Sequence, residues 1–101
     1  MINARAVEKI ERHVNDAIAR GAKVVVGGRR VRNAVAAGPN YYAPTVLIDA
    51  TPAMALSCEE TFGPVAPIFR FQDEAEVVAQ ANDTPFGLAA YLYTQNIARA
   101  W

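Results

Sequence analysis

The two side chains best suited to nucleophilic chemistry are one thiol and one imidazole, those of Cys58 and His13. A histidine beside a cysteine can act as its general base. The carboxylates that follow the thiol, Glu59 and Glu60, oppose that role, because negative charge beside a thiolate disfavours the ionised thiol. We therefore assign no catalytic role to Cys58 and interpret His13 as a partly buried helix residue. The pair also supplies too few ligands for a zinc site.

Residues 57–60, Ser-Cys-Glu-Glu, have the spacing of a helix capping box. The context opposes a helix, since residues 61–64, Thr-Phe-Gly-Pro, would break it after about one turn. A carboxylate and an aromatic ring two residues apart, followed by a rigid Gly-Pro pair, suit a loop that presents both side chains to a ligand. We predict that Glu60 and Phe62 form such a pair. The alternative is a helix cap at Glu60 and a core aromatic at Phe62.

The composition indicates one globular segment covering residues 1–101. Hydrophobic residues make up 52% of the chain and charged residues 20%, which excludes a disordered or collagen-like class. Ten basic and ten acidic side chains give a formal net charge of 0. A balanced chain has no long-range field for nucleic acid or an anionic membrane, so we expect neither as a partner.

The sequence also bears on the compartment. No apolar run approaches the roughly 20 residues that span a bilayer, and the charged N-terminal pattern lacks the apolar core of a signal peptide. A single cysteine cannot close an intramolecular disulfide, which fits a reducing environment. We expect a cytoplasmic chain.

Helices and strands alternate in the hydrophobic pattern. Val7, Ile10 and Val14 share one helical face, which predicts an amphipathic helix over residues 3–20. Four strands are predicted, at residues 23–26, 42–48, 65–71 and 88–94. Further helices are predicted from Thr51-Pro52, from Asp73 to before residues 84–85, and over 97–101.

Residues 29–40 have weak periodicity and are predicted to form a loop. Three arginines in it, Arg29, Arg30 and Arg32, could bind a phosphate, but we favour a solvated run of charge. The alternation of helices and strands predicts an α/β fold, a partial open sheet with crossover helices. A methionine that precedes the first helix directly and an aromatic residue inside the last one suggest that both ends belong to something larger.

Four stretches of the chain, at residues 21–28, 42–47, 59–67 and 81–91, resemble the aldehyde dehydrogenase superfamily in order and spacing. Glu-Glu-Thr-Phe-Gly-Pro at residues 59–64 is highly specific for that superfamily. Thr61 and the continuation over residues 66–71 are more similar to its succinate-semialdehyde dehydrogenase branch. The resemblance implies a piece of the catalytic domain of an oxidoreductase that converts succinate semialdehyde or a similar aldehyde to the acid.

The resemblance also implies the chemistry of the complete enzyme. In that family a cysteine thiolate attacks the aldehyde, the adduct gives hydride to NAD or NADP, and an activated water hydrolyses the thioester. Carried over to this sequence, Glu60 is the residue that hydrogen-bonds the ribose hydroxyls on the nicotinamide side. Phe62 is the residue that packs beside the nicotinamide ring and holds it for hydride transfer.

The same resemblance implies which parts lie elsewhere. The family's nucleophile precedes this segment in a different motif, so Cys58 does not inherit its role, and the general-base glutamate and the Rossmann domain also lie outside. We expect cofactor contacts from Glu60 and Phe62, no catalytic residue and no metal site. The expected partners are the rest of the parent enzyme, a small aldehyde and further copies in a homo-oligomer. The alternative is a non-catalytic truncated module that associates through exposed sheet edges.

Overall fold

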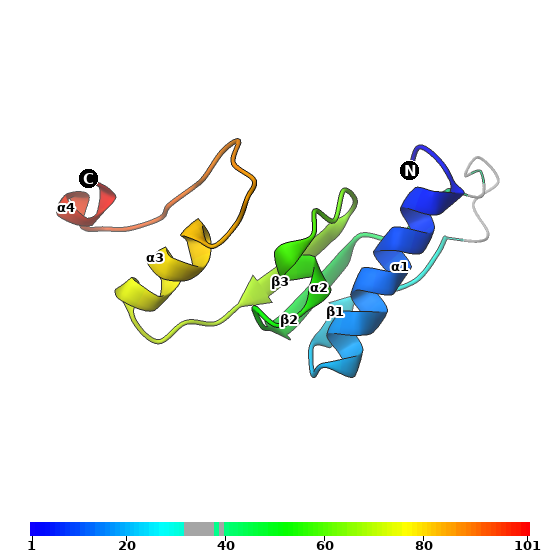
Figure 1. Cartoon of the computed structure of the whole chain (residues 1–101), viewed down its shortest axis with the longest axis horizontal. Coiled ribbons are helices and arrows are strands. Elements are labelled where there is room, and N and C mark those ends of the chain that lie inside the picture. Colours follow the sequence, from blue (N-terminus) through cyan, green and yellow to red (C-terminus); the bar gives the residue numbers. More distant parts are fainter. Residues whose placement is uncertain (32–37, 39) are drawn as a thin grey trace.

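The computed structural model describes residues 1–31, 38 and 40–101. The elements run in the order α1 (Ala4–Ala19), β1 (Lys23–Val26), β2 (Thr45–Ala50), α2 (Ala55–Cys58), β3 (Val65–Phe69), α3 (Glu74–Asn82) and α4 (Ile97–Ala100). Figure 1 shows a body made by the elements from α1 to β3, and an arm that leads away from it to α3 and α4. None of the helices in the described part of the chain is long and apolar enough to cross a bilayer.

A three-stranded sheet forms the middle of the body, in the order β1-β2-β3. The strand β1 pairs antiparallel with β2, and β2 pairs parallel with β3. A parallel pair needs a crossover connection, which the stretch containing α2 supplies. The predicted α/β fold with an open sheet and a crossover helix is therefore confirmed. Asp49, at a φ of 57°, lies where the register between β2 and β3 shifts.

The core lies between α1 and the sheet. Buried side chains from both, with others from the turns that follow, form one cluster: Val7, Ile10, Val14, Ala17, Ala22, Tyr42, Leu47, Ala50, Met54 and Leu56. The side chain of Asn3 caps α1 by accepting from the Ala6 N–H at 2.9 Å. The helix ends before Gly21, whose φ of 108° suits only glycine.

Helix α1 also holds the start of α2. The carboxylate of Asp16 accepts from the backbone N–H of Ala55 at 2.8 Å and from the Arg20 guanidinium at 2.9 Å. The backbone hydrogen bond is the main cause that lowers the pKa of Asp16. A side chain from one helix thus satisfies a free amide at the N-terminus of the next.

Two predicted boundaries are corrected by the structure. The second strand begins at Thr45 instead of Tyr42, because Pro44 has no N–H to donate and Tyr42 pairs only in an isolated bridge with Arg30. The short helix begins after Met54 instead of at Thr51, because residues 51–54 form a turn in which the Met54 N–H donates to the Thr51 carbonyl.

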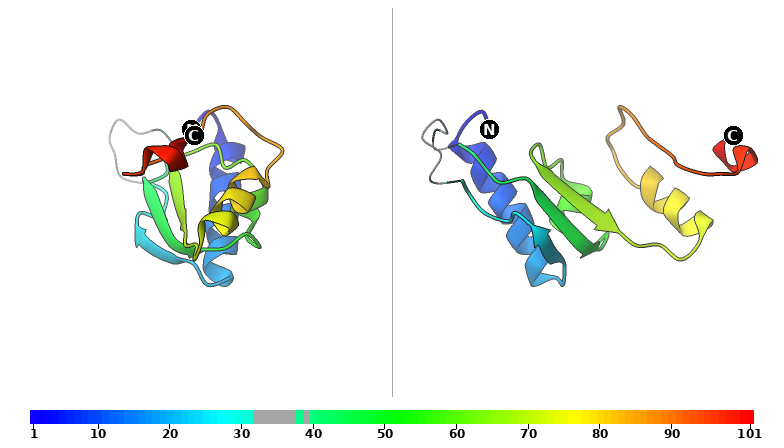
Figure 2. Two further views of the ribbon diagram at one scale, coloured as in Figure 1. Left: turned by 90° about the vertical axis from the view of Figure 1, so that its left-hand side faces the viewer. Right: turned by 180° about the vertical axis from the view of Figure 1, so that it is seen from behind.

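The strand predicted at residues 88–94 is wrong. The described chain forms no strand there, and Leu88, Tyr91 and Tyr93 are almost fully exposed. A strand needs a neighbour to satisfy its backbone groups. Seen from behind in Figure 2, this stretch runs alone between α3 and α4.

The predicted loop over residues 29–40 is described only in part, since residues 32–37 and 39 lie outside the described residues. Arg32 is among them. The guanidinium of Arg30 donates to both carboxylate oxygens of Glu11 at 2.6 Å. Arg30 is therefore paired with a carboxylate, which differs from the solvated run of charge favoured for this loop and leaves its guanidinium engaged instead of free for a phosphate.

Gly27 is the position where the fold tolerates a side chain least. Its φ is 81°, and a Cβ there would overlap the carbonyl oxygen of Pro44. We expect Gly27→Ala to lower the free energy of unfolding by roughly 2–5 kcal/mol, through backbone strain and overpacking together. Urea unfolding at low protein concentration measures the change.

Gly21→Ala is the matched control for that substitution. Gly21 also has a positive φ, but no atom lies within 4 Å of its Cβ position. Gly21→Ala should therefore lower the free energy of unfolding only by the cost of backbone strain, about 1–3 kcal/mol. Equal losses at the two glycines would show that the contact with Pro44 is unimportant.

Candidate functional site

The stretch of residues 59–64 connects α2 to β3 and contains both residues of the expected ligand-binding pair. It begins at Glu59 in extended backbone, with φ −109° and ψ 141°. In extended chain, successive side chains point to opposite sides. Residues 59, 61 and 63 contact α1, whereas the alternate residues Glu60 and Phe62 are exposed.

His13 makes two of those contacts. Its ring lies on α1 with 0% of the residue exposed. One ring nitrogen, Nε2, lies 3.0 Å from the Glu59 carboxylate, and the other, Nδ1, lies 2.5 Å from the hydroxyl of Thr61. The guanidinium of Arg12 donates to the same Glu59 oxygen at 3.0 Å. Neighbouring side chains of one helix therefore hold two alternate residues of the stretch.

Gly63 makes the third contact. A Cβ at this position would overlap the tip of the Ile10 side chain, which is buried in the core. The stretch therefore lies directly on α1, and the missing side chain is what permits the close approach. Ile10 and His13 are three residues apart and so lie on one face of the helix.

Glu60 and Phe62 are left on the outer side. Glu60 is exposed, and 81% of Phe62 is exposed. In this segment α2 ends at Cys58, before Glu60, and Phe62 is not part of the core cluster, so neither a helix cap nor a core aromatic is seen among the described residues. The two side chains offer an exposed carboxylate and an exposed aromatic ring, next to residues that contact α1.

The electrostatics of the stretch fix the hydrogen bonds of His13. The hydrogen bond from His13, together with the charge of Arg12, holds the pKa of Glu59 below its usual value although partial burial raises it. The Glu59 side chain is therefore an acceptor near neutral pH, and Nε2–H donates to it. In the neutral imidazole, Nδ1 is then the acceptor and the Thr61 hydroxyl donates.

The structure separates His13 from any thiol chemistry. Both ring nitrogens are taken by Glu59 and Thr61, whereas Cys58 is exposed on α2 with its Sγ directed at the Pro52 carbonyl oxygen, 3.8 Å away. His13 is also more deeply buried than the sequence suggested. Among residues 1–31, 38 and 40–101, no group of His, Cys, Asp and Glu side chains could hold a metal ion.

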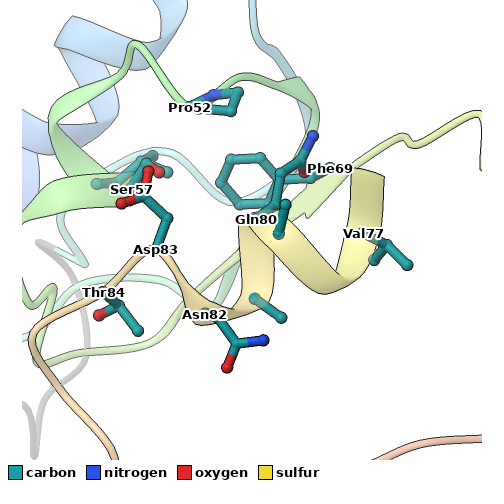
Figure 3. Close-up of a pocket in the computed structure, with 11 residues that line it drawn as sticks. Pro52, Ser57, Phe69, Val77, Gln80, Asn82, Asp83 and Thr84 are labelled. Carbon is teal, nitrogen blue, oxygen red and sulfur yellow. The ribbon is translucent and has the colours of Figure 1, made fainter. Parts of the chain in front are cut away.

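A cavity of about 800 Å³ is lined by Phe69 of β3, by Pro52 and Ser57 next to it, and by Val77 and Gln80 of α3 (Figure 3). Leu56 adds to its apolar wall. Neither residue of the Glu60–Phe62 pair lines it, so it is a separate feature of the surface.

The contacts of His13 are what sequence reasoning missed. A signal was available, because His13 follows Ile10 by three residues on the apolar side of α1, and a buried imidazole must find hydrogen-bond partners. The identity of those partners was not readable, since Glu59 and Thr61 lie 46 and 48 residues away along the chain.

The model of the aldehyde dehydrogenase family matches residues 1–101, which is the whole chain. The chain belongs to the aldehyde dehydrogenase family. The resemblance read from residues 21–28, 42–47, 59–67 and 81–91 is thereby confirmed.

Known aldehyde dehydrogenases with similar sequences cover this chain completely. Succinate-semialdehyde dehydrogenase [NADP(+)] of Escherichia coli (strain K12) and glutarate-semialdehyde dehydrogenase of Pseudomonas aeruginosa are each 50% identical over 101 residues, which is 100% of this chain and 20% of theirs. The crystal structure of succinate-semialdehyde dehydrogenase from Burkholderia pseudomallei has a TM-score of 0.91 at 51% identity, over 100% of this chain and 20% of that one.

This aldehyde dehydrogenase chain thus spans about a fifth of the length of the relatives that it matches. The predicted oxidoreductase class and the NAD or NADP cofactor of such enzymes are confirmed at the level of the family. The roles of Glu60 and Phe62 toward that cofactor stay predictions.

Proposed function

We propose that this chain is a segment of an NAD(P)-dependent semialdehyde dehydrogenase, and that it contributes cofactor contacts through Glu60 and Phe62. The observation that carries the proposal is the alternation along residues 59–64. Alternate residues are held on α1 by His13 and Ile10, which leaves the carboxylate and the ring exposed together. A pair held in this way meets a ligand without first having to be ordered.

The chemistry of the two side chains fits a nicotinamide nucleotide. A carboxylate offers two acceptor oxygens, which match the two hydroxyl donors of a ribose. An exposed aromatic ring offers a flat apolar surface for a planar ring. The bound cofactor supplies the hydride acceptor, and this chain's part is to bind and orient it, so that the nicotinamide stays where hydride transfer is possible.

The proposed substrate is a short aldehyde that carries a carboxylate at its other end. Its support is the similarity to succinate- and glutarate-semialdehyde dehydrogenases. The same proposal includes two partners, the rest of the parent enzyme and further copies in a homo-oligomer. It also includes a cytoplasmic location.

A non-catalytic associating module is the second candidate. One observation favours it: the described residues after α3 are all exposed, and they include many large apolar side chains. Such a surface promotes association whether or not the chain takes part in catalysis.

Turnover assays test the proposed function. The complete dehydrogenase that carries this segment should reduce NAD⁺ or NADP⁺ with succinate semialdehyde, whereas the purified 101-residue chain should produce no NADH or NADPH. The reason is that catalysis needs a thiolate next to a bound nicotinamide, which this segment is not expected to assemble, and His13 is engaged with Glu59 and Thr61 instead of Cys58. Turnover by the purified chain, lost on Cys58→Ser, would overturn the assignment.

A further inference from the structure

We propose that His13 is a positioning residue of the cofactor site, because its buried ring bonds the residues before and after Glu60 and so sets the direction of Glu60 and Phe62. This inference rests on the function proposed above. It adds a residue that lies on a different element, touches no part of the proposed ligand and acts only through Glu59 and Thr61.

The ring of His13 is a fixed point. It is fully buried on α1, between Ile10 and Val14 in a helix whose apolar face packs into the core. Interiors are close-packed, so a buried ring has little freedom to rotate. Both of its nitrogens are used, one by the Glu59 carboxylate and one by the Thr61 hydroxyl.

The two hydrogen bonds lie on either side of Glu60. With residues 59 and 61 held by one ring, the backbone between them has few conformations left, and the side chain of Glu60 must point away from α1. Phe62 is constrained in the same way, since Thr61 is bonded to His13 and Gly63 packs on Ile10. The same helix face therefore orients both ligand-binding side chains.

Arg12 cannot replace this function. It reaches the same oxygen of Glu59, but its side chain is 61% exposed, and the hydroxyl of Thr61 is bonded to His13 instead. An exposed ion pair contributes little and holds its partner loosely. Among the described side chains, the imidazole is the one that bonds both residue 59 and residue 61.

The test uses the complete dehydrogenase with three variants. His13→Ala removes both hydrogen bonds. His13→Gln keeps a donor amide near the position of Nε2 and so can still bond Glu59. Val14→Ala is the matched control, because it removes buried methyl groups from the neighbouring position of α1 and lowers stability without a hydrogen bond to residues 59–64.

We expect His13→Ala to raise the cofactor dissociation constant about tenfold, because a misdirected Glu60 would lose one charge-assisted hydrogen bond to the cofactor. The KM for the aldehyde should stay unchanged. His13→Gln should recover most of the cofactor affinity, and Val14→Ala should change it by no more than about twofold. Melting temperatures of all variants are measured alongside.

A purely structural histidine gives a different result. If His13→Ala and Val14→Ala lower the melting temperature by similar amounts and both leave the cofactor affinity unchanged, the positioning role is wrong. If His13→Ala does not fold, Thr61→Val removes one of the two hydrogen bonds without a cavity and must weaken cofactor binding by itself. An unchanged affinity in Thr61→Val would also refute the proposal.

Glu60→Gln separates this inference from the function on which it rests. If Glu60→Gln weakens cofactor binding while His13→Ala does not, the positioning role fails and the proposed function stands. If neither variant affects the cofactor, both fail. If both weaken it and Val14→Ala does not, both are supported.

Discussion

Replacing Glu60 by glutamine in the complete dehydrogenase is expected to raise the dissociation constant of the cofactor by about 10- to 150-fold. Glutamine keeps the shape of the side chain but loses the charge, and a hydrogen bond to a charged group contributes roughly 1.5–3 kcal/mol. Glu60 is exposed on a stretch that α1 holds, so the loss cannot be recovered by a simple rearrangement of residues 59–64. Titration of the cofactor by fluorescence measures the change.

Part of the loss should appear in the hydride step. A ribose that is held loosely lets the nicotinamide move from its reactive position, and a displacement of about 1 Å can lower the rate by as much as 100-fold. With an aldehyde deuterated at its reacting carbon, the isotope effect on kcat should therefore be larger in the variant than in the parent. Phe62→Ala should act in the same direction by removing the ring that supports the nicotinamide.

Glu8→Gln is the control for Glu60→Gln. It makes the same chemical change at an exposed position of α1 and should leave the cofactor affinity unchanged. If Glu60→Gln and Phe62→Ala lower only the melting temperature, with cofactor affinity and turnover intact, then the two side chains serve the fold and the cofactor assignment is wrong.

The isolated 101-residue chain is expected to self-associate almost completely at tens of micromolar, a range in which exposed apolar surface and unpaired strands commonly aggregate. Its radius of gyration is 15.6 Å, whereas a compact domain of this length has about 13 Å. The arm carries Leu88 at 103%, Tyr93 at 97% and Trp101 at 99% exposure. Apolar surface of this extent is unfavourable in water, so its burial against another chain is favoured.

Sedimentation velocity measures this association. The double variant Leu88→Ser with Trp101→Ser should shift the distribution toward the monomer, because it removes two of the largest exposed apolar side chains. Gln72→Ser with Gln95→Ser makes the same number of changes at exposed polar positions of the same arm and should not. A single monomeric species for the unmodified chain would refute the prediction.

The helices were largely predictable because their signals are local. The apolar face of α1 and the Asp73 cap of α3 are both written within a few residues, and the Asp73 side chain accepts from the Glu76 N–H at 2.8 Å as the capping box requires. One detail differs, since the Glu76 carboxylate accepts from the N–H of Gln72 instead of Asp73.

Strands depend on partners, which is why residues 88–94 were predicted wrongly. Their composition favours a strand, but a strand exists only where another backbone lies beside it. The candidate site likewise combines features set by the local sequence with features set by contacts between distant parts of the chain. The Glu60–Phe62 pair was proposed from its spacing and stays a prediction, whereas the bonds of His13 to Glu59 and Thr61 join parts of the chain that only the fold brings together.

Helix α1 contacts the stretch from Ala55 to Gly63 at several points along its length. Asp16 fixes the start of α2, and His13 and Ile10 fix the stretch that follows. A small tilt of α1 would therefore displace Glu60 and Phe62 as well, because the residues beside them are bonded to or packed on this helix. If Glu60 and Phe62 contact the cofactor as proposed, a displacement of this helix would alter cofactor binding without any change in the residues that contact it.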